Sequence, residues 1–242
     1  MYETDMTADA VVRTLRRQAD PERGKVLARF FKTGPGEYAE GDRFWGIPVP
    51  VTRATLRRFR NLPIKEIERL LGHPVHEARV AAVILLADRF ARADEREQGR
   101  IYRLYLANTR SINNWDLVDL SAPKIVGAWL LDRPKGMLRS LARSENLWER
   151  RIAMVATLAF ISRGESEDAL DIAARLINDR HDLIHKAVGW MLREVGKRCS
   201  LEAERAFLDR HAATMPRTAL RYAIERLSPG ERRHDMGLKP VG

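Results

Sequence analysis

The sequence predicts an all-α fold in which antiparallel helix pairs stack into a curved solenoid. Apolar residues recur at helical spacing along almost the whole chain, and no segment alternates apolar and polar residues as a half-buried strand does. A weak internal repeat supports the solenoid, since RVAAV at residues 79–83 reappears as RIAMV at residues 151–155. The two copies begin 72 residues apart. Half of that distance is about 36 residues, a length typical of two-helix repeats.

Each expected helix ends near residues that cap or break helices. Thr52 and Ser200 are expected N-caps, Pro123 is expected to open a new helix after Ser121, and Gly164 is expected to close the helix before it. In chain order, the helices are expected at residues 7–18, 22–32, 52–61, 64–71, 76–91, 94–107, 114–121, 123–131, 135–143, 147–161, 166–176, 181–197, 201–213 and 216–227.

The chain has 242 residues, enough for one packed domain, which is expected over residues 1–229. Its longest irregular loop is expected to begin at Gly34 and to end near Pro50. Residues 230–242 carry few apolar side chains, so a flexible C-terminal tail is expected there.

The charge and the cysteine content narrow the class of protein. Lys and Arg number 43 and Asp and Glu 33, which gives a formal net charge of +10 and favours polyanionic partners such as nucleic acid. The single cysteine, Cys199, excludes an intrachain disulfide and is typical of a reducing compartment. The start of the chain is acidic, unlike a secretory signal, and no segment approaches the roughly 20 apolar residues of a membrane span. A soluble cytoplasmic monomer is therefore expected.

The segment NNWDLVD at residues 113–119 places an aromatic ring and a carboxylate on one side of a helix. Residues four apart on a helix are neighbours, so Trp115 and Asp119 share a face. Leu117 and Leu120 point roughly 150° away and are expected to face the core, which leaves the Trp115 ring exposed. An aspartate late in a short helix is more often a surface or capping residue than a catalyst, so the pattern alone assigns no reaction.

The helix expected at residues 181–197 combines an aromatic ring with cations. Its apolar stripe lies roughly 130° from Trp190, which falls among Lys186, Arg193 and Lys197. This face suits a phosphate backbone with a sugar or base against the ring. In the alternative interpretation, Trp190 fills a groove between helices and the cations are only solvated. The stripe consists of Ile184, Ala187, Val188, Met191 and Val195.

The helix expected at residues 147–161 begins with two arginines, Arg150 and Arg151. The helix dipole disfavours positive charge in the first turn, so a local anion is expected to offset it. Glu149 is one candidate for that anion, and a DNA phosphate is the other.

Four segments, in sequence order, resemble the AlkD-type DNA glycosylases, a family of HEAT-like helical-repeat proteins that excise alkylated purines. FWGIPVP at 44–50 resembles the N-terminal loop of the family, NNWDLVD at 113–119 its catalytic segment, LWERRIA at 147–153 its arginine helix and KAVGWMLRE at 186–194 its second tryptophan helix. The resemblance spans most of residues 25–225. The chain departs from the family where Asn114 replaces the first tryptophan of a tandem pair, and where the loop at residues 34–46 is longer and more acidic.

The resemblance implies a DNA glycosylase that releases 3-methyladenine and 7-methylguanine from duplex DNA without a base-flipping pocket. It implies that Asp119 stabilises positive charge on the deoxyribose and that the rings of Trp115 and Trp190 flank the sugar. It also implies that Arg151 contacts a phosphate near the lesion, whereas Arg150 matches no family residue and is expected to be solvated.

The other DNA-binding candidates are the cations around Trp190, namely Lys186, Arg193 and Lys197. No cofactor is expected, and no metal site, because His181 and His185 lack a third ligand at fixed spacing and are expected to cap a helix or to be solvated. Some relatives bind branched DNA without excision. A non-catalytic helical-repeat module that binds structured DNA or a protein partner is therefore the alternative function.

Overall fold

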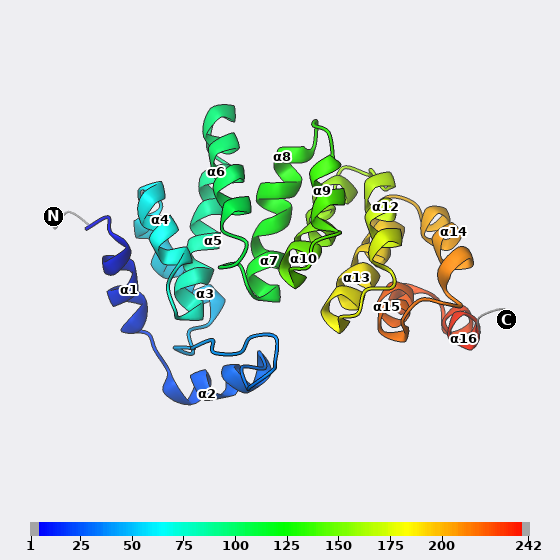
Figure 1. The fold of residues 1–242 in the computed structure, drawn as a ribbon, viewed down its shortest axis with the longest axis horizontal. Coiled ribbons are helices and arrows are strands. Elements are labelled where there is room, and N and C mark those ends of the chain that lie inside the picture. Colours follow the sequence, from blue (N-terminus) through cyan, green and yellow to red (C-terminus); the bar gives the residue numbers. More distant parts are fainter. Residues whose placement is uncertain (1–4, 239–242) are drawn as a thin grey trace. The chain divides into compact units, whose positions relative to one another are not determined.

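The computed structural model describes residues 5–238 and shows an all-α protein, as the periodicity predicts (Figure 1). Within these residues the only β pairing is an isolated bridge between Arg43 and Val75. The chain divides into two compact units, Met1–Ser121 and Ala122–Gly242. The single domain over residues 1–229 and the curved solenoid remain predictions. No helix in the described part of the chain has the length and apolar character that crossing a membrane requires.

Helix α5 forms the core of the first unit. It packs against α1, α3, α4 and α6 (Figure 1), and nearly all of its residues are buried because it is apolar on almost every side. The helices are α1 (Ala8–Arg16), α2 (Pro21–Phe30), α3 (Val49–Leu56), α4 (Ile64–Leu71), α5 (His76–Phe90), α6 (Glu95–Ala107) and α7 (Trp115–Ala122), with a 3₁₀ turn at Arg57–Phe59.

Helix α13 (Asp182–Arg198) forms the core of the second unit. It packs against α10, α12, α14 and α15, and every residue of its predicted apolar stripe is fully buried, which confirms that stripe. Gly189 lets α15 approach closely, because a Cβ there would lie 2.2 Å from the carbonyl oxygen of Ala219. The other elements are a π-helical turn (Pro123–Gly127), α8 (Ala128–Leu130), α9 (Gly136–Leu141), α10 (Leu147–Ala156), α11 (Leu158–Ile161), α12 (Glu167–Leu176), α14 (Leu201–His211), α15 (Arg217–Ala223), a 3₁₀ turn (Ile224–Arg226) and α16 (Pro229–Gly237).

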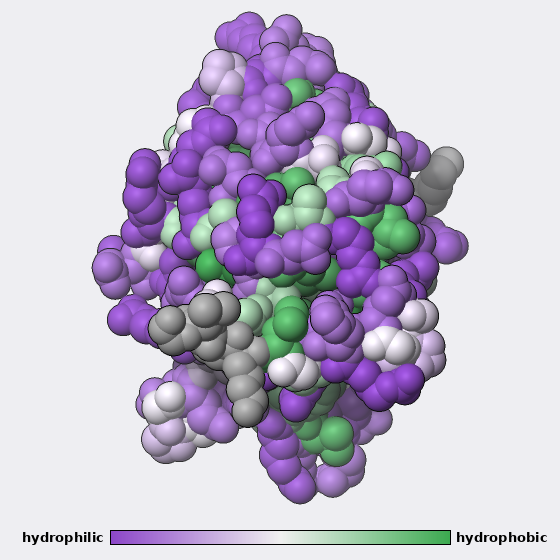
Figure 2. Space-filling model, turned by 90° about the vertical axis from the view of Figure 1, so that its right-hand side faces the viewer, coloured by the Kyte–Doolittle hydropathy of each residue, from purple (hydrophilic) through white to green (hydrophobic). Residues whose placement is uncertain are grey.

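The outer surface at the C-terminal end is mostly hydrophilic. Figure 2 views the molecule from the side on which α14 and α16 lie in Figure 1, and shows apolar residues scattered among polar and charged ones. Scattered apolar residues are normal on a protein surface and indicate no docking site by themselves.

Of the four expected helix boundaries, those at Ser200 and Gly164 are confirmed and those at Thr52 and Pro123 are wrong. Ser200 caps α14 by accepting a hydrogen bond from a backbone N–H, and Gly164, with φ of 84°, closes the helix before it. Thr52 is not a cap, because α3 begins three residues earlier and Thr52 lies inside it, buried. The earlier start is possible because Pro50 lies in the first turn, where a backbone N–H has no helical partner to lose.

Pro123 does not open a new helix, because α7 continues through the π-helical turn into α8. A proline ring clashes with the carbonyl group four residues earlier, which belongs to Asp119, and a wider π turn relieves such a clash. The helix expected over residues 147–161 is instead interrupted at Thr157, whose hydroxyl donates to the carbonyl of Met154 at 2.7 Å.

Residues 230–237, expected within a flexible tail, belong to the helix α16, which begins at Pro229. Ser228 and Glu231 make a capping box in which each side chain accepts a hydrogen bond from the other's backbone N–H, at 3.3 and 2.8 Å. Arg205 of α14 pairs with Glu231 and with Asp235, and these contacts outweigh the low apolar content of the segment. Residues 239–242 of the expected tail lie outside the described part of the chain.

The irregular loop between α2 and α3 is fixed by a buried carboxylate. Glu77 of α5, which is 3% exposed, accepts hydrogen bonds from the backbone N–H groups of Trp45, Gly46 and Ile47 at 2.7–3.1 Å. Gly46 has φ of 83°, a conformation that other residues rarely adopt. The loop is therefore an ordered part of the first unit.

Candidate functional site

Trp115 is the first residue of α7, and its ring is packed against other aromatic rings. It stacks on Phe31, with ring centroids 5.2 Å apart and planes inclined by 21°, and meets Phe30 edge-on at 6.1 Å. Trp115 is half-buried, so the freely exposed ring expected from the pattern is wrong. Phe30 itself is 62% exposed, which leaves an open aromatic surface beside Trp115.

Phe31 is the centre of a group that we call the aromatic cluster, made of Phe30, Phe31, Phe44, Trp115 and the ring of His76. Phe44 stacks on Phe31 with centroids 5.1 Å apart, and the His76 ring lies 4.6 Å from Phe44. The members come from α2, the loop after it, α5 and α7. The Trp115 ring therefore contacts Phe30 and Phe31 directly, and Phe31 connects it to Phe44 and to the His76 ring of α5.

A chain of charged side chains links the loop, α5 and α7. His76 Nε2 lies 2.7 Å from Asp116 Oδ2, and His76 Nδ1 lies 3.6 Å from Asp42 Oδ2. Arg79 donates to the other oxygen of Asp42 at 2.6 Å. The side chains of His76, Arg79 and Asp42 are all buried. Asp116 directly follows Trp115, so this charged chain also fixes the first turn of α7.

Asp119 is half-buried on α7, one helical turn after Trp115. Leu117 is fully buried as expected, whereas Leu120 is only half-buried and does not face the core completely. The shared face of Trp115 and Asp119 follows from their spacing on an observed helix.

A buried pair of hydroxyl groups anchors α7 to α6. Ser121 donates to the carbonyl of Leu117 at 2.6 Å, so its single proton is used and Tyr105 must donate to Ser121, at 2.8 Å. Burial and the charge of Asp119 raise the pKa of Tyr105, which keeps the phenol protonated. Asp119 thus lies near a neutral hydroxyl group.

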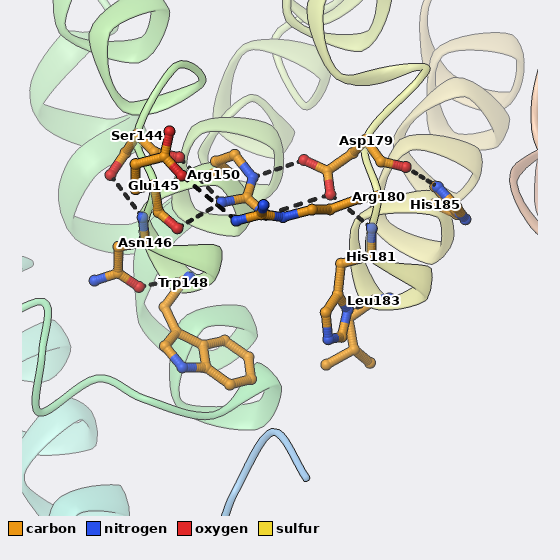
Figure 3. A network of polar contacts seen from close by, with 10 residues as sticks. All are labelled: Ser144, Glu145, Asn146, Trp148, Arg150, Asp179, Arg180, His181, Leu183 and His185. Atoms are coloured by element: carbon orange, nitrogen blue, oxygen red, sulfur yellow. Dashed lines mark hydrogen bonds and ion pairs between the residues drawn. The ribbon is translucent and has the colours of Figure 1, made fainter. Parts of the chain in front are cut away.

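Arg150 of α10, expected to be solvated, is only 7% exposed, so that expectation is wrong. Its Nε and Nη2 atoms donate to Asp179 at 2.6 and 3.3 Å, and its Nη1 atom donates to the carbonyls of Ser144 and Glu145 at 3.0 Å (Figure 3). Asp179 also accepts the backbone N–H of His181 at 2.8 Å. The guanidinium is therefore bonded on all its sides by protein acceptors.

The contacts of Arg150 have a counterpart in the first unit. Arg79 and Arg150 are each the fourth residue of a helix, each donates to the carbonyl six residues earlier at 2.9 and 3.0 Å, and each pairs with an aspartate. His185, the fourth residue of α13, also bonds the carbonyl six residues earlier. These contacts match Arg79 with Arg150, whereas the sequence repeat matches it with Arg151.

Arg151 is buried as well, with 5% of its surface exposed. Its Nη1 atom donates to the carbonyl of Leu183 in the first turn of α13, so the guanidinium joins α10 to α13. The phosphate contact implied by the resemblance remains a prediction.

The face of α13 around Trp190 carries the expected residues, but its charge is partly neutralised. Trp190 is half-buried. Lys186 pairs at 2.7 Å with a carboxylate one turn earlier, and Arg193 pairs with Glu225. Lys197 is exposed. Two of the three cations therefore have carboxylate partners that a phosphate would have to replace.

Comparison with known proteins identifies the family. The model of a family described as DNA alkylation repair enzyme matches residues 11–227. The chain belongs to the DNA alkylation repair enzyme family. A solved structure described as a predicted DNA alkylation repair enzyme from Enterococcus faecalis has a TM-score of 0.68 and 20% identity to the chain, over 88% of this chain and 98% of that one. At this identity the likeness concerns the fold. No curated protein matches the chain.

Membership of the DNA alkylation repair enzyme family indicates an enzyme that acts in the repair of alkylated DNA, with DNA as its substrate. The resemblance stated from the four sequence segments is thereby confirmed at the level of the family. The roles of individual residues remain predictions, because membership alone does not assign them.

The two histidines of α13 in this DNA alkylation repair family member bond the backbone. His181 caps α13, its ring accepting the N–H of Leu183 at 3.1 Å, which confirms the capping interpretation for that residue. His185 bonds the carbonyl of Asp179. Between residues 5 and 238, no group of three His, Cys, Asp or Glu side chains is placed to hold a metal ion. Burial raises the pKa of the Cys199 thiol.

Phe31, His76 and Asp116 position Trp115 and its helical turn, and none of them was predicted as a site residue. The adjacent Phe30 and Phe31 at the start of the loop were the visible signal, because phenylalanine is among the residues that are most often buried. The pairing of His76 with Asp116 joins residues 40 positions apart and has no local pattern.

The charged chain predicts a pH-dependent stability. Burial alone lowers the pKa of His76, but the carboxylates of Asp116 and Asp42 outweigh it and raise the pKa to about 9. The folded protein binds this proton more tightly than the unfolded chain. The stabilisation is therefore complete below pH 6.5, roughly the pKa of an unfolded histidine, and is lost as the pH rises through about 9.

Urea unfolding at several pH values should show the free energy of unfolding falling by about 2–3 kcal/mol between pH 6.5 and 9.5. His76→Gln keeps a polar side chain but cannot titrate, so its unfolding free energy should be lower at pH 6.5 and nearly flat across this range. An equal fall in both proteins would exclude His76 as the cause.

Proposed function

We propose that this enzyme is a monofunctional DNA glycosylase, which hydrolyses the N-glycosidic bond of positively charged alkylated purines such as 3-methyladenine and 7-methylguanine in duplex DNA. The observation that carries the proposal is the pair of Trp115 and Asp119, one turn apart on α7. The aromatic cluster fixes the Trp115 ring, and the charged chain through Asp116 fixes the first turn of the same helix.

The chemistry needs few protein groups. An alkylated purine already carries positive charge and leaves as a neutral base, so no strong acid has to protonate it. As the bond lengthens, positive charge develops on the deoxyribose. The carboxylate of Asp119 stabilises that charge and orients the attacking water, which supplies the hydroxyl group to the sugar and a proton to the solution. The Trp115 ring adds the attraction of its π face for a cation.

The second unit contributes DNA contacts in this proposal. Trp190 and Lys197 present a half-buried ring and an exposed cation on one helix. Lys186 would exchange its carboxylate partner for a phosphate, which costs little because both side chains of that pair are exposed. Arg193 would likewise exchange Glu225 for a phosphate. Arg151 would contact a phosphate near the lesion. The proposed enzyme uses no base-flipping pocket, in contrast to most enzymes that act on bases.

Base release is the direct test. A duplex carrying one 7-methylguanine, and a second carrying 3-methyladenine, are incubated with excess protein, and the free base is measured by chromatography. Release well above spontaneous depurination is expected, with none from the unmodified duplex. Tight binding to branched or damaged DNA without any release would favour the non-catalytic binding module instead.

A further inference from the structure

The first unit contains an arginine-lined groove away from the aromatic cluster. It lies between the segment formed by α3 with its following 3₁₀ turn and helix α5, two elements that lie side by side in Figure 1, and it encloses about 700 Å³. Arg53, Arg57, Arg60 and Arg92 line it, together with Asp88. We call this the arginine groove. A second cavity of about 310 Å³ continues it and shares Arg60 and Arg92.

The charge of the arginine groove is almost uncompensated. Four guanidinium groups face one carboxylate, Asp88, and none of the four has an ion-pair partner within the described residues. Arg89, which lines only the second cavity, is paired with Glu97. Clustered like charges repel each other, so the groove is stabilised when an anion occupies it. The face around Trp190 differs, since Lys186 is already paired there.

Two features make the groove suitable for a chain of phosphates. Arg92 donates hydrogen bonds to the carbonyls of Asp88 and Arg60, both at 3.0 Å. Its guanidinium group is therefore oriented before a ligand binds. Arg53, Arg57 and Arg60 follow helical spacing and form a row roughly 10 Å long. One strand of duplex DNA places about three phosphates along that length.

We propose that the arginine groove binds the phosphodiester backbone of DNA and is the main electrostatic anchor of the protein. The choice of DNA as the polyanion rests on the proposed function. The groove shares no residue with the aromatic cluster or with Asp119, so its role is to hold DNA and not to act on the bond that breaks.

The test is the salt dependence of binding to an unmodified duplex, measured by fluorescence anisotropy from 50 to 300 mM salt. The variant Arg53→Gln/Arg57→Gln/Arg60→Gln removes the row. The slope of log Kd against log salt should fall by about 2–3, and the affinity at 100 mM salt should fall at least about 10-fold. The control variant Arg163→Gln/Arg175→Gln/Arg180→Gln removes the same charge from arginines that are ion-paired at the surface of the second unit. Its slope should change by less than about 1.

A second variant is expected to bind DNA more tightly, a result that loss of folding could not produce. Asp88→Asn removes the only carboxylate of the groove, and the affinity for the unmodified duplex should rise by about 2–10-fold at low salt. Equal losses in the two triple variants, or an unchanged affinity for Asp88→Asn, would overturn the proposal. Because the duplex is unmodified, this result is independent of base release. A protein that binds DNA through the groove but excises nothing would refute the glycosylase function and leave the anchor in place.

Discussion

Replacing Asp119 with asparagine is expected to slow the excision of 7-methylguanine by about 100-fold or more, the usual effect of losing a preorganised electrostatic partner of the transition state. Asparagine keeps the size of the side chain and removes its charge. The affinity for undamaged DNA should be unchanged or slightly higher, because a negative charge near phosphates has been removed. Single-turnover excision with protein in excess measures the chemical step without interference from product release.

A matched control is Asp132→Asn, which removes a carboxylate that is 77% exposed and paired with Arg163 at the surface. It should excise at the parental rate. Thermal unfolding of both variants shows whether α7 remains folded, since the charge of Asp119 also acts on the buried Tyr105. A folded Asp119→Asn protein with near-parental excision would remove Asp119 from the mechanism and favour the binding module.

Replacing Arg150 with alanine is expected to lower the free energy of unfolding by about 3–5 kcal/mol, because it leaves the carboxylate of Asp179 buried without its partner. The side chains of the pair are only 8% and 6% exposed, so solvent cannot replace the lost guanidinium. The carbonyls of Ser144 and Glu145 lose their donor as well (Figure 3). Urea unfolding followed by circular dichroism measures the loss.

The neighbouring Arg180 provides the control, since its pairing with Glu145 joins side chains that are 77% and 96% exposed. Arg180→Ala should cost about 0–1 kcal/mol, as exposed pairs usually do. Similar stabilities for the two variants would show that Arg150 and Asp179 are not a structural pair in solution.

These expectations reverse the ranking that the sequence suggests for the two arginines of α10. From sequence, Arg151→Ala is expected to weaken DNA binding and excision with the fold intact, and Arg150→Ala is expected to matter less. The burial of both residues adds a stability cost at each position. An effect of Arg151→Ala on DNA binding therefore supports a phosphate contact only when unfolding measurements show that the variant is folded.

The fold class and most of the helices could be predicted from the sequence. The helix Ile64–Leu71 has the predicted bounds, and the apolar stripe of α13 is buried as the spacing predicts. These features are local, because the residues that define a helical face lie within a few turns of each other and need no knowledge of the partner helix. The family could also be identified from short segments in the right order, which the match over residues 11–227 confirms.

The contacts that hold the candidate residues in place became visible only in the folded protein. Trp115 is half-buried because Phe31 lies against it, Asp116 is ordered because His76 faces it, and Arg150 is structural because Asp179 meets it. Each partner lies between 29 and 84 positions away in the chain. The sequence pattern of a helix says which side a residue occupies, but not what is packed against that side. The packing partner decides how exposed a side chain is and whether its charge is already paired. Exposure and pairing in turn decide whether the residue can contact DNA or only stabilises the fold.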